Sequence, residues 1–150
     1  AGTGRLLLDL HAVTGEAEWL DAARSLVEGL ESTGAPETRS KGLWNNHGQC
    51  CGDAGIGEFA LLMAARTGEA AYRDLAARCA DVIVASAERS DGAARWRDAE
   101  HRDRPEFVQA QTGYMQGAAG IASFLIHLAT TQDGAPVKIA LPDWPRESAR

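Results

Sequence analysis

The chain has 150 residues, of which 45% are hydrophobic and 24% charged, which is typical of a globular domain with its own core. Its formal net charge of −6 argues against broad nucleic-acid binding, because contacts to phosphates need clustered Lys and Arg. No apolar stretch reaches the roughly 20 residues that span a bilayer, and no signal peptide is visible. We therefore expect neither a nucleic-acid nor a membrane partner.

The chain has three cysteines, and two of them are adjacent. An odd number with this spacing does not make the disulfide framework of a small secreted protein, so we expect a reducing, cytoplasmic location. The sequence begins without Met and already within a helical pattern. This start predicts that the chain belongs to a longer protein, with room for upstream domains.

From the first residue onward, one Gly-rich pattern occurs three times. The copies read "AGTGRLLLDL", "AGIGEFALLM" and "AGIASFLIHL", and they align on Gly2, Gly55 and Gly120, which are 53 and 65 residues apart. Each glycine-rich start is followed by apolar residues at helical spacing. The repeat predicts helices that begin in equivalent turns.

The first two copies continue into a second helix. Gly15 and Gly68 follow the apolar runs and suit the left-handed conformation that ends a helix. Second helices are expected from 19 to about 31 and from 72 to about 88, each with an apolar stripe. The unit is therefore a helix pair, with copies near 1–31 and 54–88 and part of a third near 118–129.

The segments 31–42 and 90–105 carry the Gly, Pro, Ser and charged residues that are typical of loops. No alternation of apolar and polar residues is long enough to predict a sheet. The fold class is therefore all-α, with helix pairs stacked or closed into a ring and the Gly-rich turns gathered at one end. Side chains at that end would form the functional face.

Two adjacent thiols, Cys50 and Cys51, stand directly before the second Gly-rich helix. A helix N-terminus favours a thiolate, so we expect lowered thiol pKa values. A zinc site would take these two ligands, with His47 as a nearby candidate for a third. A nucleophilic cysteine would use His47 as base and Asp53 as its partner. A vicinal redox pair would close a strained ring, and plain packing of small apolar side chains also fits.

Several neighbouring residues have two interpretations. His47 is a candidate catalytic residue that accepts or orients the proton of a substrate thiol, but it could also cap a turn. Asp53 is expected to cap its helix through backbone N–H groups. Cys79 lies at a core-like position of a second helix. Residues 114–116, just before the last Gly-rich turn, are candidates for lining the same mouth.

Together, the repeat and the "CCGDAG" turn at 50–55 resemble the lanthionine synthetase C-like cyclases. In that family a Gly-rich motif begins the inner helices of an α/α toroid, and one copy reads Cys-His-Gly-x-Ala-Gly. Here Cys51 stands where the histidine usually does. The sequence is similar to a Cys-Cys-Gly variant of the lanthipeptide synthetases, which has a zinc site made of three cysteines. The resemblance runs from Ala1 to about Ala129.

The resemblance implies that 1–150 is the C-terminal part of such a toroid domain, with a partial set of repeats. It implies a zinc-assisted cyclase that adds a cysteine thiol of a precursor peptide to a dehydroamino acid and so forms a thioether ring. Cys50 and Cys51 would bind Zn²⁺, and a third cysteine would lie in a Trp-Cys-x-Gly motif upstream of residue 1. Some relatives lack the zinc ligands, so the alternative is a non-catalytic toroid that binds a peptide or protein partner.

Overall fold

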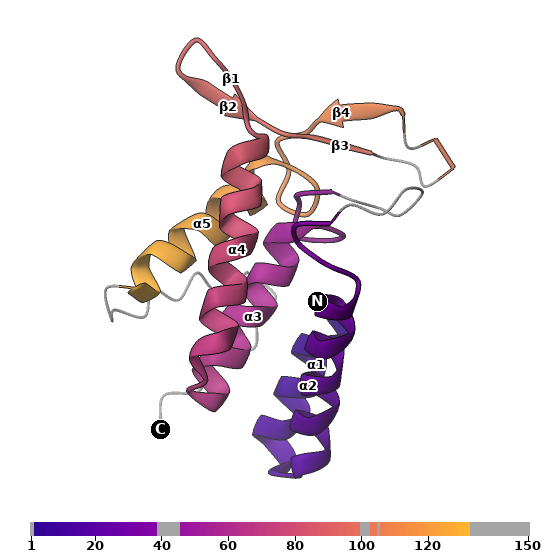
Figure 1. Cartoon of the computed structure of the whole chain (residues 1–150), viewed down its shortest axis with the longest axis vertical. Coiled ribbons are helices and arrows are strands. Elements are labelled where there is room, and N and C mark those ends of the chain that lie inside the picture. Colours follow the sequence, from indigo (N-terminus) through magenta and orange to yellow (C-terminus); the bar gives the residue numbers. More distant parts are fainter. Residues whose placement is uncertain (1, 39–45, 100–102, 105, 133–150) are drawn as a thin grey trace.

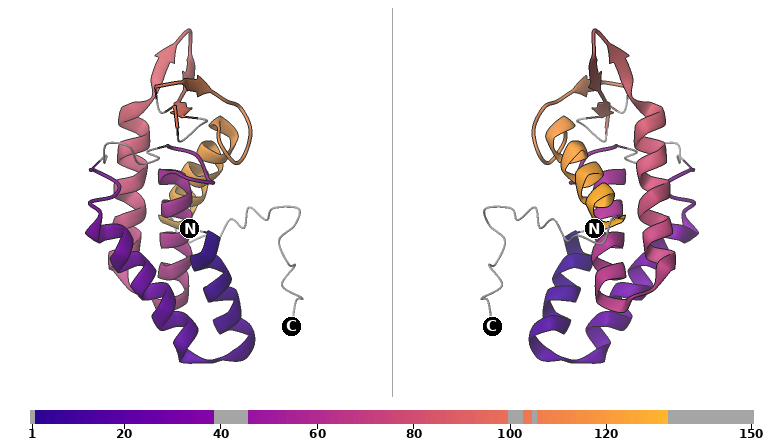
Figure 2. Two further views of the ribbon diagram at one scale, coloured as in Figure 1. Left: turned by 90° about the vertical axis from the view of Figure 1, so that its right-hand side faces the viewer. Right: turned by 90° about the vertical axis from the view of Figure 1, so that its left-hand side faces the viewer.

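The computed structural model describes residues 2–38, 46–99, 103–104 and 106–132. Its helices in chain order are α1 (Gly2–Thr14), α2 (Ala17–Ser32), α3 (Asp53–Thr67), α4 (Ala70–Ser86) and α5 (Ala118–Gln132). Figure 1 and Figure 2 show α1, α3 and α5 as neighbours in one layer, with α2 packed against α1 and α4 against α3. The prediction of two helix pairs and part of a third is confirmed.

Both helix pairs are joined by the same Thr-Gly turn. The hydroxyls of Thr14 and Thr67 each donate a hydrogen bond to the carbonyl oxygen four residues earlier, at 2.9 Å. Each hydroxyl also accepts a hydrogen bond from the N–H two residues later, at 3.2 Å. Gly15 and Gly68 follow with φ angles of 74° and 77°, in the left-handed region that glycine adopts without strain. The expected helix ends are therefore confirmed.

The helices of the inner layer approach one another through aromatic rings that lie on glycines. The ring of Phe59 in α3 covers Gly4 in α1, and the ring of Phe124 in α5 covers Gly57 in α3. The two phenylalanines occupy the same position in their copies, and so do the two glycines. One packing contact therefore recurs along the layer and sets how closely neighbouring repeats approach.

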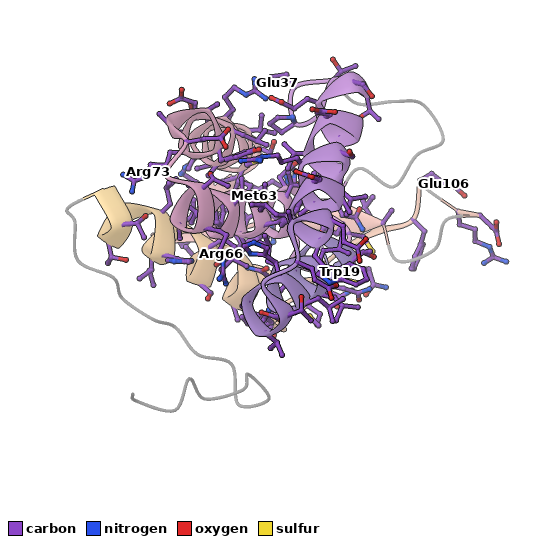
Figure 3. All side chains as sticks on the ribbon, turned by 90° about the horizontal axis from the view of Figure 1, so that it is seen from below. Trp19, Glu37, Met63, Arg66, Arg73 and Glu106 are labelled. Atoms are coloured by element: carbon purple, nitrogen blue, oxygen red, sulfur yellow. The ribbon has the colours of Figure 1, made fainter. Side chains whose placement is uncertain are left out.

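The core lies between the inner layer, formed by α1, α3 and α5, and the outer helices α2 and α4. Its largest fully buried side chains are those of Phe124, Met63, Ile83, Ile121 and Cys79, so the packing role predicted for Cys79 is confirmed. Figure 3 shows Met63 between the helices and Arg73 at the periphery. Within the described ranges, no helix has the length and apolar character needed to cross a bilayer.

The segment after α4, predicted as a loop over 90–105, contains short strands. β1 (Glu88–Ser90) pairs antiparallel with β2 (Ala93–Arg95), and β3 (Arg97–Ala99) pairs antiparallel with β4 (Val108–Ala110). Three-residue strands are too short to give an alternating pattern, so the sequence does not predict them. The Asp-Gly turn between β1 and β2, with φ angles of 52° and 76°, was the available signal.

The strands do not change the fold class, which is that of stacked helix pairs. Both hairpins lie at the end of the molecule where α3 and α5 begin (Figure 1). Of these strands, β3 contacts the turn before α3, where Asp98 accepts hydrogen bonds from the backbone N–H groups of His47 and Gly48. This end of the layer carries the thiol turn.

The contact between Phe124 and Gly57 predicts a loss of stability in Gly57→Ala. The added Cβ would lie within 3.0 Å of a ring that is 0% exposed and has no room to move. Overpacking of this kind typically costs about 1–3 kcal/mol, which urea unfolding measures.

Gly29→Ala in α2 is the matched control, because nothing lies within 4 Å of its added Cβ. This change should stabilise the helix by about 0.5–1 kcal/mol. Equal shifts of the two variants in the same direction would contradict the role of the close approach.

Candidate functional site

The two thiols belong to a turn, residues 46–52, that folds back over the start of α3. The N–H groups of Asp53 and Ala54 donate hydrogen bonds to the carbonyl oxygens of Asn46 and His47, both at 3.1 Å. A Cβ at position 52 would lie within 3.0 Å of the Asn46 carbonyl group. Only glycine fits there, so Gly52 allows the turn to lie against its own helix.

The third copy forms the same turn at 111–117. The N–H groups of Ala118 and Ala119 donate to the carbonyl oxygens of Gln111 and Thr112, at 3.0 and 3.3 Å, and Gly117 lies against the Gln111 carbonyl group. The backbone framework is therefore repeated, whereas the reactive side chains are not. Where the earlier turn has His47, Cys50, Cys51 and Asp53, the later one has Thr112, Met115, Gln116 and Ala118.

Cys50 and Cys51 are both exposed, and the Cys51 thiol donates a hydrogen bond to Cys50 Sγ at 3.3 Å. The Cys50 N–H donates to the carbonyl oxygen of Met115 at 2.8 Å, which joins the thiol turn to the matching turn of the next repeat. Met115 itself is 59% exposed. Of the residues 114–116 expected at this mouth, Met115 and Gln116 lie against the thiol turn through their backbone atoms.

The pKa of Cys51 is raised to about 11, mainly by partial burial and then by its hydrogen bond to Cys50, which is lost on ionisation. The expectation that the helix N-terminus lowers the thiol pKa is therefore wrong for Cys51. Cys51 precedes the N-cap Gly52, and desolvation of the thiolate together with the nearby Cys50 raises its pKa. Without a bound cation, this thiol stays protonated near neutral pH.

His47 forms a buried pair with Asp53. Its Nδ1 lies 2.8 Å from Asp53 Oδ2, and the two side chains are only 9% and 8% exposed. The carboxylate favours the tautomer with the proton on Nδ1, in which Nε2 carries the lone pair. The N-cap position of α3 is held by Gly52, so Asp53 acts in the first turn as the partner of the imidazole.

Asp98, which was not predicted as a site residue, lies on β3 and is 3% exposed. Its Oδ1 accepts a hydrogen bond from the His47 N–H at 2.9 Å, and its Oδ2 accepts one from the Gly48 N–H at 3.2 Å. Beside it, the Asn46 side chain exchanges two hydrogen bonds of 2.9 Å with the backbone of Ala99. No local pattern signals these contacts, because their partners are about fifty residues apart in the sequence.

The thiols alone are an incomplete metal site. Within the part of the chain that the structure describes, no group of three or more His, Cys, Asp or Glu side chains could hold a metal ion. His47 therefore does not join Cys50 and Cys51 in a three-ligand set, although its place in the sequence suggested it. Two neighbouring thiols still fit Zn²⁺ as soft ligands, and they leave further positions to be filled.

A layer of helix pairs that begin in Gly-rich turns, with its polar groups at the turn end, defines an α/α repeat protein. The sequence matches the family model of the lanthionine synthetase C-like proteins over residues 1–141, and the chain belongs to this family. The family fold is an α/α toroid, of which the helix pairs here form a partial set. A comparison with curated proteins gives no significant match.

The raised pKa of Cys51 predicts how fast this thiol reacts. In the metal-free protein, its alkylation by iodoacetamide should speed up about tenfold per pH unit from pH 7 to 10, because only the thiolate reacts. Cys50→Ala removes the hydrogen-bond acceptor, so the pKa of Cys51 should fall and its reaction at pH 8 should become faster. Tandem mass spectrometry distinguishes the two adjacent positions, and a rate plateau below pH 9 in the unmodified protein would contradict the assignment.

Proposed function

We propose that the chain is part of a zinc-dependent peptide cyclase that adds the thiol of a peptide cysteine to dehydroalanine or dehydrobutyrine. Membership of the lanthionine synthetase C-like family implies a peptide substrate or partner. One observation supports the catalytic proposal most strongly. Of two turns with the same backbone, only one carries exposed adjacent thiols, and it also carries the His47–Asp53 pair.

Cys50 and Cys51 are proposed as two zinc ligands, with a third cysteine supplied from upstream of residue 1, as in the Cys-Cys-Gly variant. Bound zinc would lower the pKa of the substrate thiol and favour its nucleophilic thiolate. Cys51, with its pKa raised to about 11, fits a ligand that ionises when a cation arrives. Free thiols of this kind suit the reducing conditions of the cytoplasm, where we propose that the protein acts.

His47 is proposed as the proton acceptor. With Nδ1 held by Asp53, its Nε2 lone pair would take the proton of the substrate thiol, and the buried carboxylate would stabilise the imidazolium. In the addition, the sulfur bonds to the β-carbon of the dehydroamino acid and the α-carbon takes up a proton. A proton returned from His47 balances the reaction.

A non-catalytic toroid that binds a peptide or protein partner is the second candidate. It is favoured by the incomplete ligand set, since the described residues bring only two thiols together. Metal content separates the two candidates.

The protein with its complete N-terminal region should contain one zinc ion per chain, measured by elemental analysis after purification. Cys50→Ala and Cys51→Ala should each lose most of it, because each removes a thiolate ligand. Cys79→Ala is the control, since Cys79 is buried in the core and should leave the zinc content unchanged. Zinc-free unmodified protein, or unchanged content in Cys51→Ala, would favour the binding-only candidate.

His47→Gln should keep zinc but slow thioether formation by about 100-fold, the lower range for loss of a general base. Ring closure does not change the mass of a dehydrated peptide, so the measurement follows the loss of thiols that react with N-ethylmaleimide. Thr112→Val changes the equivalent position of the other turn and should leave the rate unchanged. A full rate in His47→Gln would remove His47 from the mechanism.

A further inference from the structure

We propose that Asp98 is the positioning residue of the thiol turn: by binding the backbone of His47 and Gly48, it fixes the orientation in which Cys50 and Cys51 meet a metal ion. The metal part of this inference rests on the proposed zinc function. The hydrogen bonds from the His47 and Gly48 N–H groups to Asp98, here called the clamp, do not depend on a metal ion.

The clamp consists of one buried carboxylate that bridges two successive peptide N–H groups. Its two oxygens accept at 2.9 and 3.2 Å, so both peptide planes before the thiols are fixed together. Hydrogen bonds to an ionised acceptor are stronger than neutral ones, and burial shields them from water. The reciprocal bonds between Asn46 and Ala99 hold the same segment one residue earlier.

The opposite side of the turn lies against the third repeat. The backbone N–H of Cys50 donates to the Met115 carbonyl oxygen at 2.8 Å, and the Gln49 side-chain amide donates to the Gly120 carbonyl oxygen at 2.9 Å. A Cβ at Gly48 would lie 2.8 Å from the same Met115 oxygen, so there is no spare space on that side. The thiol turn is thus held between β3 and the neighbouring turn.

This arrangement separates the clamp from the ligands. Asp98 is not one of the proposed ligands. It binds the backbone N–H groups of His47 and Gly48, and it thereby sets where the chain places the thiols two to four residues later. Partners that orient metal ligands typically contribute 10-fold to 100-fold to metal affinity. A purely structural carboxylate would change the stability of the fold and leave the affinity of the folded protein unchanged.

The test uses Asp98→Asn in the protein with its complete N-terminal region. The amide keeps the size of the side chain but sets an N–H group against a backbone N–H, so one of the two bonds is lost. Zinc affinity, measured by competition with a chelator, should fall about tenfold. Backbone amide exchange over 46–52 should become at least about tenfold faster in metal-free protein.

Gln109→Ala is the matched control, because Gln109 is exposed on β4 directly opposite Asp98 and should change neither measurement. Unchanged zinc affinity and exchange in folded Asp98→Asn, even with a lower melting temperature, would overturn the proposal. If the unmodified protein binds no zinc, the proposed function fails, and the exchange rates still decide whether the clamp exists.

A second variant covers the case in which Asp98→Asn does not fold. Asn46→Asp removes the donor to the Ala99 carbonyl oxygen and keeps the acceptor for the Ala99 N–H. It should loosen the same segment and weaken zinc binding by less than Asp98→Asn does, because one of the two Asn46 bonds remains. Unchanged exchange over 46–52 in this variant would also contradict the clamp.

Discussion

The carbonyl group of Asn46 occupies the space in which any side chain at position 52 would begin, and the carbonyl group of Gln111 does the same at position 117. This close approach lets each turn fold back onto the helix that it starts. Glycines 4 and 57 apply the same constraint between helices, where they receive the rings of the next repeat. The close approach at Gly52 therefore places residues 47–51, with the two thiols, against the start of α3.

The site divides its polar groups by burial. His47, Asp53 and Asp98 are each below 10% exposed and bind one another or the backbone, so they give the turn a fixed shape. The thiols of Cys50 and Cys51 are exposed at its surface. A buried carboxylate or imidazole is stable only when hydrogen-bonded, which ties the integrity of the turn to these partners. Reactive groups can then face solvent without being mobile.

Sequence periodicity predicted the helices, their left-handed glycine ends and the recurring turns, because each of these is set by residues within about four positions of one another. The sequence also indicated the thiol turn, since its adjacent cysteines occur in only one copy of the repeat. The Asp98 contacts could not be predicted from the sequence, because they join β3 to a turn about fifty residues earlier. The pairing of Asp53 with His47 was considered only in one alternative, and the high pKa of Cys51 depends on burial that no local pattern encodes.

The duplicated turn has a consequence for how this fold acquires reactivity. The same hydrogen bonds from N–H groups to carbonyl oxygens, together with one glycine, occur in both copies, so one backbone path accommodates two different sets of side chains. The side chains of one copy can therefore change while the neighbouring copy supports its backbone, as the carbonyl oxygen of Met115 does by accepting a hydrogen bond from the Cys50 N–H. The repeat thus provides equivalent turns in which a reactive site can form. The turn at 111–117 has this backbone without the reactive side chains. Placing His, Cys and Asp at its equivalent positions would test whether the shared backbone is enough to make the turn reactive.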